Sequence, residues 1–152
     1  MSGTSRKRVR SLALGLLTTA LLLTSSGCGD LSDDELNRGV ESLSALAAQG
    51  QLVANGVARD ATKATYARAM ARTLGEEAEH EAEKLADATL EEPGTADQRH
   101  AAVAVAGEIS GLLSELQTFP GDERHGELVE KHLGEAQEKA DAIVAQLSGD
   151  AP

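Results

Sequence analysis

The 152-residue chain contains no tryptophan and only two aromatic residues, Tyr66 and Phe119. This scarcity argues against aromatic platforms on which nucleic-acid bases or sugars could stack. The single cysteine, Cys28, cannot form a disulfide within the chain. The sequence also has no Gly-x-Ser-x-Gly nucleophile motif and no phosphate-binding glycine loop. Because no specific signal for catalysis is present, we predict a protein that is not an enzyme and needs no cofactor.

The N-terminal segment has the layout of a secretory signal. Basic residues at positions 6, 7, 8 and 10 precede an apolar run from Leu12 to Leu23. This run is shorter than the roughly 20 residues that cross a bilayer as a helix, and its basic flank fits a signal peptide. Ser26, Gly27 and Cys28 follow and match the lipobox of bacterial lipoproteins, in which Leu usually occupies the position that Ser25 has here.

Residues 1–28 therefore resemble a bacterial lipoprotein signal. The resemblance implies cleavage after residue 27, a diacylglyceryl group on the thiol of Cys28, and often further acylation of the new N-terminus. An ordinary cleaved signal and an uncleaved anchor are the alternatives, although no Ala-x-Ala cleavage site lies near the end of the apolar run. Arg8 and Arg10 are not adjacent, so we expect the general export route and an extracytoplasmic protein. Residues 28–32 would form a short tether between lipid and folded body.

Acidic residues dominate the chain after the cysteine. All 25 acidic residues follow Cys28, whereas four of the 14 basic residues precede it. The remaining 10 basic and 25 acidic side chains give the body a formal net charge of −15. Such a body is repelled by nucleic acid and by anionic lipid surfaces. We therefore expect no nucleic-acid partner, membrane attachment through the lipid on Cys28, and a protein partner of unknown identity.

The periodicity of the body predicts helices. Apolar and small residues recur at steps of three and four in four segments, and no segment alternates with a period of two. Capping boxes are expected at Ser32–Glu35 and Thr95–Gln98, and Asp122 is a further expected cap. Short links favour antiparallel neighbours. The sequence thus predicts an all-α, antiparallel up-down four-helix bundle, with helices at about 33–55, 61–91, 96–118 and 122–148, forming one domain over 33–148, and a tail at 149–152.

A Gly-x-x-x-Gly spacing joins Gly107 and Gly111 on the third predicted helix. In membranes this spacing supports helix dimers, but it then needs an apolar span. Glu108 and Glu115 interrupt this helix. We therefore expect the two glycines to allow close backbone packing inside the bundle.

A possible metal site lies in the acidic run of the second predicted helix. Glu77-Ala-Glu-His80 has the Glu-x-x-His spacing that supplies ligands in ferritin-like bundles, which the body loosely resembles. With Glu81 added, Glu77 and His80 are the candidate metal ligands. The helical period of about 100° per residue places Glu77 and Glu81 on or near the seam of the helix and His80 at its border.

The other predicted helices do not complete such a site. Glu41 and Glu138 point away from their seams, and Glu135-Ala-Gln-Glu138 contains no histidine. We therefore expect a solvated acidic face, with Glu81 paired to Lys84 or to a lysine such as Lys139. The sequence favours a lipid-anchored, non-catalytic helical-bundle protein of the bacterial cell envelope, acting through protein contacts or envelope structure. A cation- or metal-binding bundle of ferritin-like shape is the alternative.

Overall fold

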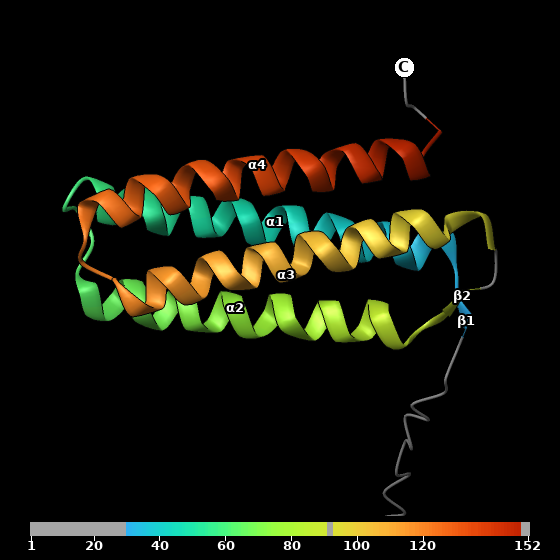
Figure 1. The fold of residues 1–152 in the computed structure, drawn as a ribbon, viewed down its shortest axis with the longest axis horizontal. Helices are drawn as coiled ribbons and strands as arrows, with labels where there is room; N and C mark the ends of the chain where they lie inside the picture. Colours follow the sequence, from blue (N-terminus) through green and yellow to red (C-terminus); the bar gives the residue numbers. More distant parts are fainter. Residues whose placement is uncertain (1–29, 91–92, 150–152) are drawn as a thin grey trace, which may run out of the picture.

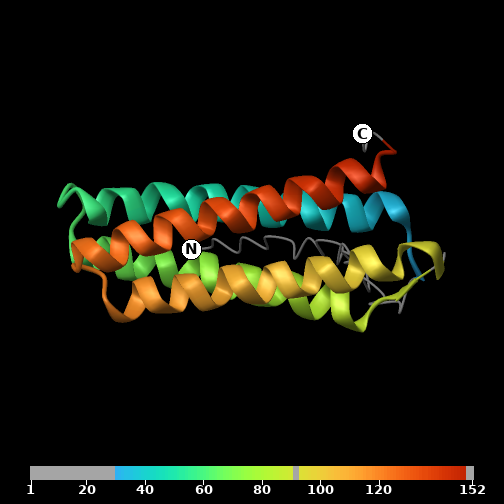
Figure 2. The same ribbon diagram turned by 45° about the horizontal axis from the view of Figure 1, so that its top comes forward.

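The computed structural model describes residues 30–90 and 93–149. Four long helices make up most of this part: α1 (Asp33–Ala58), α2 (Ala64–Asp87), α3 (Ala96–Thr118) and α4 (Glu123–Leu147). A single 3₁₀ turn, η1 (Pro93–Thr95), precedes α3. Consecutive helices run in opposite directions along one common axis (Figures 1 and 2). The predicted all-α, up-down four-helix bundle is confirmed.

The bundle consists of two closely packed helix pairs. α1 packs most extensively against α4, and α2 against α3, whereas contact between the two pairs is less extensive. The first and last helices are thus neighbours, although 64 residues separate the end of α1 from the start of α4. Among the described residues, no helix combines the length and apolar character needed to cross a membrane.

A small parallel strand pair closes one end of the bundle, which we call the proximal end (Figure 1). β1 (Asp30–Leu31) pairs with β2 (Thr89–Leu90), with Asp30 opposite Thr89 and Leu31 opposite Leu90. Leu31 is only 6% exposed and joins the hydrophobic core. The chain thus belongs to the folded body from Asp30 onward, within the segment expected to be a tether. Cys28 and Gly29 lie outside the described residues.

The helix boundaries differ from the predicted ones where neighbouring segments intervene. α1 continues past Asn55–Gly56 to Ala58, and the chain turns at Asp60, which has a positive φ of 50°. α2 ends at Asp87 rather than near residue 91, because Ala88 is extended and leads into β2. Arg99 holds this exit in place, since its Nη1 donates a hydrogen bond of 2.7 Å to the Ala88 carbonyl.

Two of the three predicted caps are present. The Ser32 hydroxyl accepts a hydrogen bond from the Glu35 amide (3.3 Å), and Glu35 accepts one from the Ser32 amide (3.2 Å). The Ser32 amide and, at 3.1 Å, the Ser32 hydroxyl both donate to the Glu35 carboxylate, and these two bonds hold the pKa of Glu35 below its ordinary value. Asp122 accepts a hydrogen bond of 3.0 Å from the His125 amide. The capping box predicted at Thr95 is wrong, because the Thr95 side chain makes no capping hydrogen bond.

The core is built from aliphatic side chains. Its largest fully buried members are leucines, an isoleucine and valines contributed by all four helices: Leu36, Val40, Leu43, Leu74, Leu85, Ile109, Leu113, Leu116, Val129 and Leu133. Phe119, the last apolar position of the third helical pattern, lies outside this core and is 45% exposed. Its ring stacks on His125 with the centroids 4.3 Å apart. The core therefore contains no aromatic ring among the described residues.

The glycines that allow close helix packing are not the ones predicted from the sequence. A β-carbon at Gly107 or Gly111 would have no neighbour within 4 Å, so close packing of these two residues inside the bundle is wrong. Both are exposed because they lie on the outward side of α3. The close helix approach occurs instead at Gly126, where a β-carbon would lie 2.6 Å from the Ala58 nitrogen and 3.0 Å from the Ala54 oxygen.

Candidate functional site

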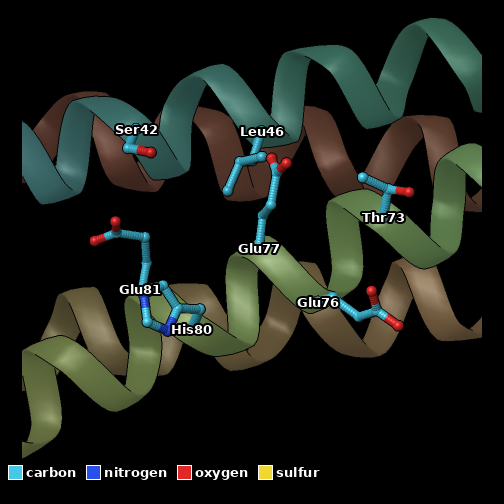
Figure 3. A pocket seen from close by; sticks show the side chains of 7 residues that line it. All are labelled: Ser42, Leu46, Thr73, Glu76, Glu77, His80 and Glu81. Atoms are coloured by element: carbon cyan, nitrogen blue, oxygen red, sulfur yellow. The ribbon is translucent and has the colours of Figure 1, made fainter. Parts of the chain in front are cut away.

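The candidate metal ligands line a groove between α1 and α2. Its lining residues are Ser42 and Leu46 from α1 and Thr73, Glu76, Glu77, His80 and Glu81 from α2 (Figure 3). The groove has a volume of about 470 Å³ and is open to solvent. It lies where the two closely packed helix pairs meet, so the looser contact between these pairs accounts for it. The structure thus brings all three candidates to one side of the bundle.

Within the groove, the carboxylates adopt different directions. Glu77 and Glu81 extend toward α1, whereas Glu76 extends away from it (Figure 3). Glu76 pairs with Arg72 at 2.8 Å and raises the pKa of that guanidinium. Glu77 and His80 are exposed. The placement of Glu77 and Glu81 near the seam follows the prediction from the helical period.

Glu81 is the least exposed acid of this group, with 18% of its side chain accessible. Its Oε2 lies 3.5 Å from Nζ of Lys84, as predicted for that pair, but accepts no hydrogen bond. The carboxylate sits beside Gly39, where a β-carbon would be 3.5 Å from Oε2. The absence of a side chain at Gly39 therefore makes room for Glu81 between the two helices. Lys139, the other lysine considered, pairs with Glu108 at 2.7 Å.

Further ligands do not approach the groove. Within residues 30–90 and 93–149, no three His, Cys, Asp or Glu side chains lie together in a way that could hold a metal ion. Glu41 is exposed and accepts a hydrogen bond of 3.0 Å from Asn37 on its own helix. Glu138 is also exposed. Of the two carboxylates that extend toward α1, Glu77 is exposed and Glu81 is largely covered, and the described residues place no further metal-binding donor beside them.

The remaining histidines on α4 are engaged locally. Nδ1 of His125 lies 3.2 Å from Asp122, and the hydrogen bonds from His125 hold the pKa of that carboxyl below its ordinary value. Nδ1 of His132 lies 3.0 Å from Glu135 and, by hydrogen bonding, lowers the pKa of that carboxyl. Each pair joins residues three apart in the sequence, His125 with the N-cap residue Asp122 and His132 with Glu135 on α4. They stabilise the helix surface and do not face one another across a site.

A polar ladder between α1 and α4 was not expected from the sequence. Three hydrogen bonds cross between these helices: Ser44 to Asp141 (2.6 Å), Gln51 to Gln137 (2.7 Å) and Asn55 to Glu130 (2.7 Å). The donors recur on α1 at steps of seven and four, which is a pattern that could have indicated a second, polar stripe. Each of these bonds forms only when its two residues lie at the same level along the bundle axis. Together the three bonds therefore fix the axial alignment of α1 and α4.

No family model, curated protein or solved structure matches this chain.

Proposed function

We propose that this protein is a lipid-anchored, non-catalytic helical bundle of a bacterial cell envelope, which acts through contacts with other proteins. The observation that carries the proposal is the Ser26-Gly27-Cys28 motif at the end of a short apolar run, immediately before the folded body. Only Gly29 separates Cys28 from β1. Two residues span at most about 7 Å. A lipid on Cys28 would therefore hold the proximal end of the bundle at the membrane surface.

The charge distribution supports attachment by lipid rather than by electrostatics. The proximal half of the described chain carries 14 acidic and 4 basic side chains, and the distal half carries 8 and 6. These halves comprise residues 30–45, 76–90, 93–107 and 136–149, and residues 46–75 and 108–135. The net charges are −10 and −2. Anionic headgroups repel the half that would face them, so the acyl chains, at about 0.8 kcal/mol per buried CH₂, must supply the attachment.

The length of the helices supports a role in protein contact. α1 has 26 residues and spans about 39 Å. If the bundle stands on its proximal end, its distal end lies about that far from the membrane. The links at 59–63 and 119–122 would then face outward, with Phe119 and Tyr66 exposed at that end. A rigid helical rod of this kind suits presentation of a surface to a neighbouring protein.

The anchoring is tested by expressing the full chain and its Cys28→Ser variant in a bacterial host. We expect the unaltered protein in the membrane fraction, with mass spectrometry showing an N-terminal Cys28 that carries a diacylglyceryl group. The variant should remain unprocessed or appear in the soluble fraction, because its acidic proximal half gives no other attachment. As a matched control, Ser25→Leu supplies the usual lipobox residue and should increase the processed fraction. An unmodified Cys28, or cleavage at another residue, would contradict the proposal.

A further inference from the structure

The two closely packed helix pairs are joined along the chain only at the distal end. The link at 59–63 connects α1 to α2, and the link at 119–122 connects α3 to α4. The third connection, from α2 to α3, stays within one pair. Figure 1 shows both links between the pairs at the end opposite the strand pair. The α2–α3 pair is therefore attached to the α1–α4 pair as one unit, through two short links at the same end.

Polar contacts between helices tie each pair together. α1 and α4 share the three hydrogen bonds of the polar ladder. Between α2 and α3, Arg68 donates through Nε to the Gln117 carbonyl (3.3 Å), and Ser110 donates to Glu79 (2.9 Å). These bonds fix the two members of each pair relative to one another. Each pair therefore has the contacts of a rigid body.

Polar contacts between the two pairs are weaker in the described part of the chain. Lys139 of α4 pairs with Glu108 of α3 at 2.7 Å, but the two side chains are 53% and 33% accessible. Exposed ion pairs of this kind contribute little to stability. On the other side of the bundle, Glu81 extends toward α1, but its Oε2 accepts no hydrogen bond (Figure 3). The two pairs are thus held together mainly by the shared apolar core.

The distal links are compact. The Gly56 carbonyl accepts hydrogen bonds from the amides of Ala61 (2.8 Å) and Thr62 (3.0 Å), so the first link is a tight turn. A β-carbon at Gly121 would lie 3.5 Å from the β-carbon of Ala64, which places the second link against the start of α2. These links keep the distal ends of the two pairs close to one another.

At the proximal end, the connection between the pairs is the β1–β2 pairing. It comprises two residues from each strand, and two-stranded ribbons are marginally stable by themselves. β1 leads into α1 through Ser32, and β2 follows α2 after Ala88. The buried side chain of Leu31 adds apolar contact with the core. We call residues 30–31 and 89–90 the latch.

We propose that the α2–α3 pair swings away from the α1–α4 pair about the two distal links, and that the latch holds the bundle closed. In hinge motions of this kind a few loop residues absorb the change while the packed elements stay intact. α2 has 24 residues and spans about 36 Å, so rotation about the distal links separates the pairs most at the proximal end. The swing exposes the core there while the helices remain folded. This device goes beyond the proposed function and does not depend on a lipid at Cys28.

Thiol labelling of buried cysteines measures the opening. The full chain with Cys28→Ser, purified in detergent, is the background in which an introduced cysteine is the only thiol. Ala102 and Ala71 are both fully buried, and each lies about two turns from the start of its helix, Ala102 toward the proximal end and Ala71 toward the distal end. Ala102→Cys should react with iodoacetamide at least tenfold faster than Ala71→Cys, because the distal end stays closed.

A second pair of probes makes the test independent of any one substitution. Ala140 and Val129 are also fully buried and lie on α4, about two turns from its proximal and distal ends. Ala140→Cys should again react at least tenfold faster than Val129→Cys. The far-ultraviolet circular dichroism of each variant should match that of the background, since a global loss of structure would expose both probes of a pair equally.

Changes in the latch test its role. Asp30 and Thr89 are paired across the strands, and the strand spacing of about 4.8 Å lies within the Cα separations of about 4.4–6.8 Å that a disulfide needs. An oxidised Asp30→Cys, Thr89→Cys bridge should slow the labelling of Ala102→Cys at least tenfold, and its reduction should restore the rate. Mass spectrometry of the peptide that contains residue 102 separates this labelling from that of the latch thiols. Leu31→Ala should instead accelerate labelling of Ala102→Cys at least threefold and leave Ala71→Cys unchanged.

The bridge also distinguishes the swing from local fraying of α3. Fraying at the start of α3 would expose residue 102 whether or not β1 is bonded to β2, whereas a rigid swing requires the latch to open. The proposal is overturned if the two probes of a pair that keeps its native circular dichroism react at equal rates. It is also overturned if the oxidised bridge leaves the rate at residue 102 unchanged.

Discussion

Replacing Gly126 by alanine should destabilise the bundle, although alanine is the better helix former. The new β-carbon would lie 2.6 Å from the Ala58 nitrogen, 3.0 Å from the Ala54 oxygen and 3.1 Å from the Ala58 Cα. All three are backbone atoms of α1, so no side chain can rotate away. Overpacking of this kind costs about 1–3 kcal/mol, and a rigid neighbour places the cost near the upper end. Alanine regains up to about 1 kcal/mol in helix propensity, which leaves a net loss of about 2 kcal/mol.

The prediction is measured on a chain of residues 29–152 by thermal and urea unfolding, followed by circular dichroism at a helical wavelength. For a domain of this size a change of 1 kcal/mol moves Tm by about 4 °C, so Gly126→Ala should melt about 8 °C lower. Gly134→Ala on the same helix is the matched control. Its β-carbon would meet Gln51 at an ordinary 3.5 Å, and its helix propensity should raise Tm by about 2–4 °C.

A Tm for Gly126→Ala equal to or above that of Gly134→Ala would refute the reasoning. It would mean that α1 and α4 do not approach each other at this point, or that α4 can shift along α1 at little cost. The urea dependence of the unfolding free energy should be the same for both variants, because they expose the same surface on unfolding. A change in that slope for Gly126→Ala alone would indicate an altered native state instead.

Three further predictions concern the core, a cap and the acidic groove. Leu113→Ala should lower the unfolding free energy by about 2–5 kcal/mol in the same assay, since Leu113 is fully buried. Asp122→Ala should destabilise α4 near neutral pH. The pKa of Asp122 is lower in the folded chain than its ordinary value of 3.8, so its ionised carboxylate stabilises the bundle at pH values above 3.8. The difference from the unaltered chain should shrink as pH falls below that value, which unfolding curves at pH 7 and pH 3 would reveal. Divalent transition metals at micromolar concentration should not raise Tm; a saturable rise that is lost in the Glu77→Ala, His80→Ala double variant would contradict this.

Local patterns in the sequence specified the helices and one capping box, because both depend on residues within one or two turns. The three-and-four spacing of apolar residues located four helices to within a few residues of their ends. Ser32 caps α1 because its backbone is extended, with φ −76° and ψ 160°, as an N-cap requires. Thr95 has the same local motif, but it ends η1 with φ −99° and ψ 9°. Its backbone does not have the extended form, and the predicted box is not formed.

The capping difference arises from tertiary contacts at the proximal end. Pairing of β2 with β1 ends α2 early and leaves the chain to enter α3 through η1. β1 is 58 residues away from β2 in the sequence, and each strand has only two residues, too few to produce a period-two pattern. The alignment of α1 with α4 likewise rests on side chains such as Asn55 and Glu130 that meet only in the folded bundle.

Glycines and acidic residues show the same division most clearly. The sequence determined that Gly107, Gly111 and Gly126 lie in helices and that Glu77 and Glu81 lie near one helical seam. Only the tertiary structure decided that Gly126 packs against a backbone while the other two glycines face outward, and that Glu81 is largely covered while Glu77 is exposed. The physical reason is that helix formation depends on neighbours along the chain, whereas the space around a side chain depends on which helix lies opposite and how closely it approaches.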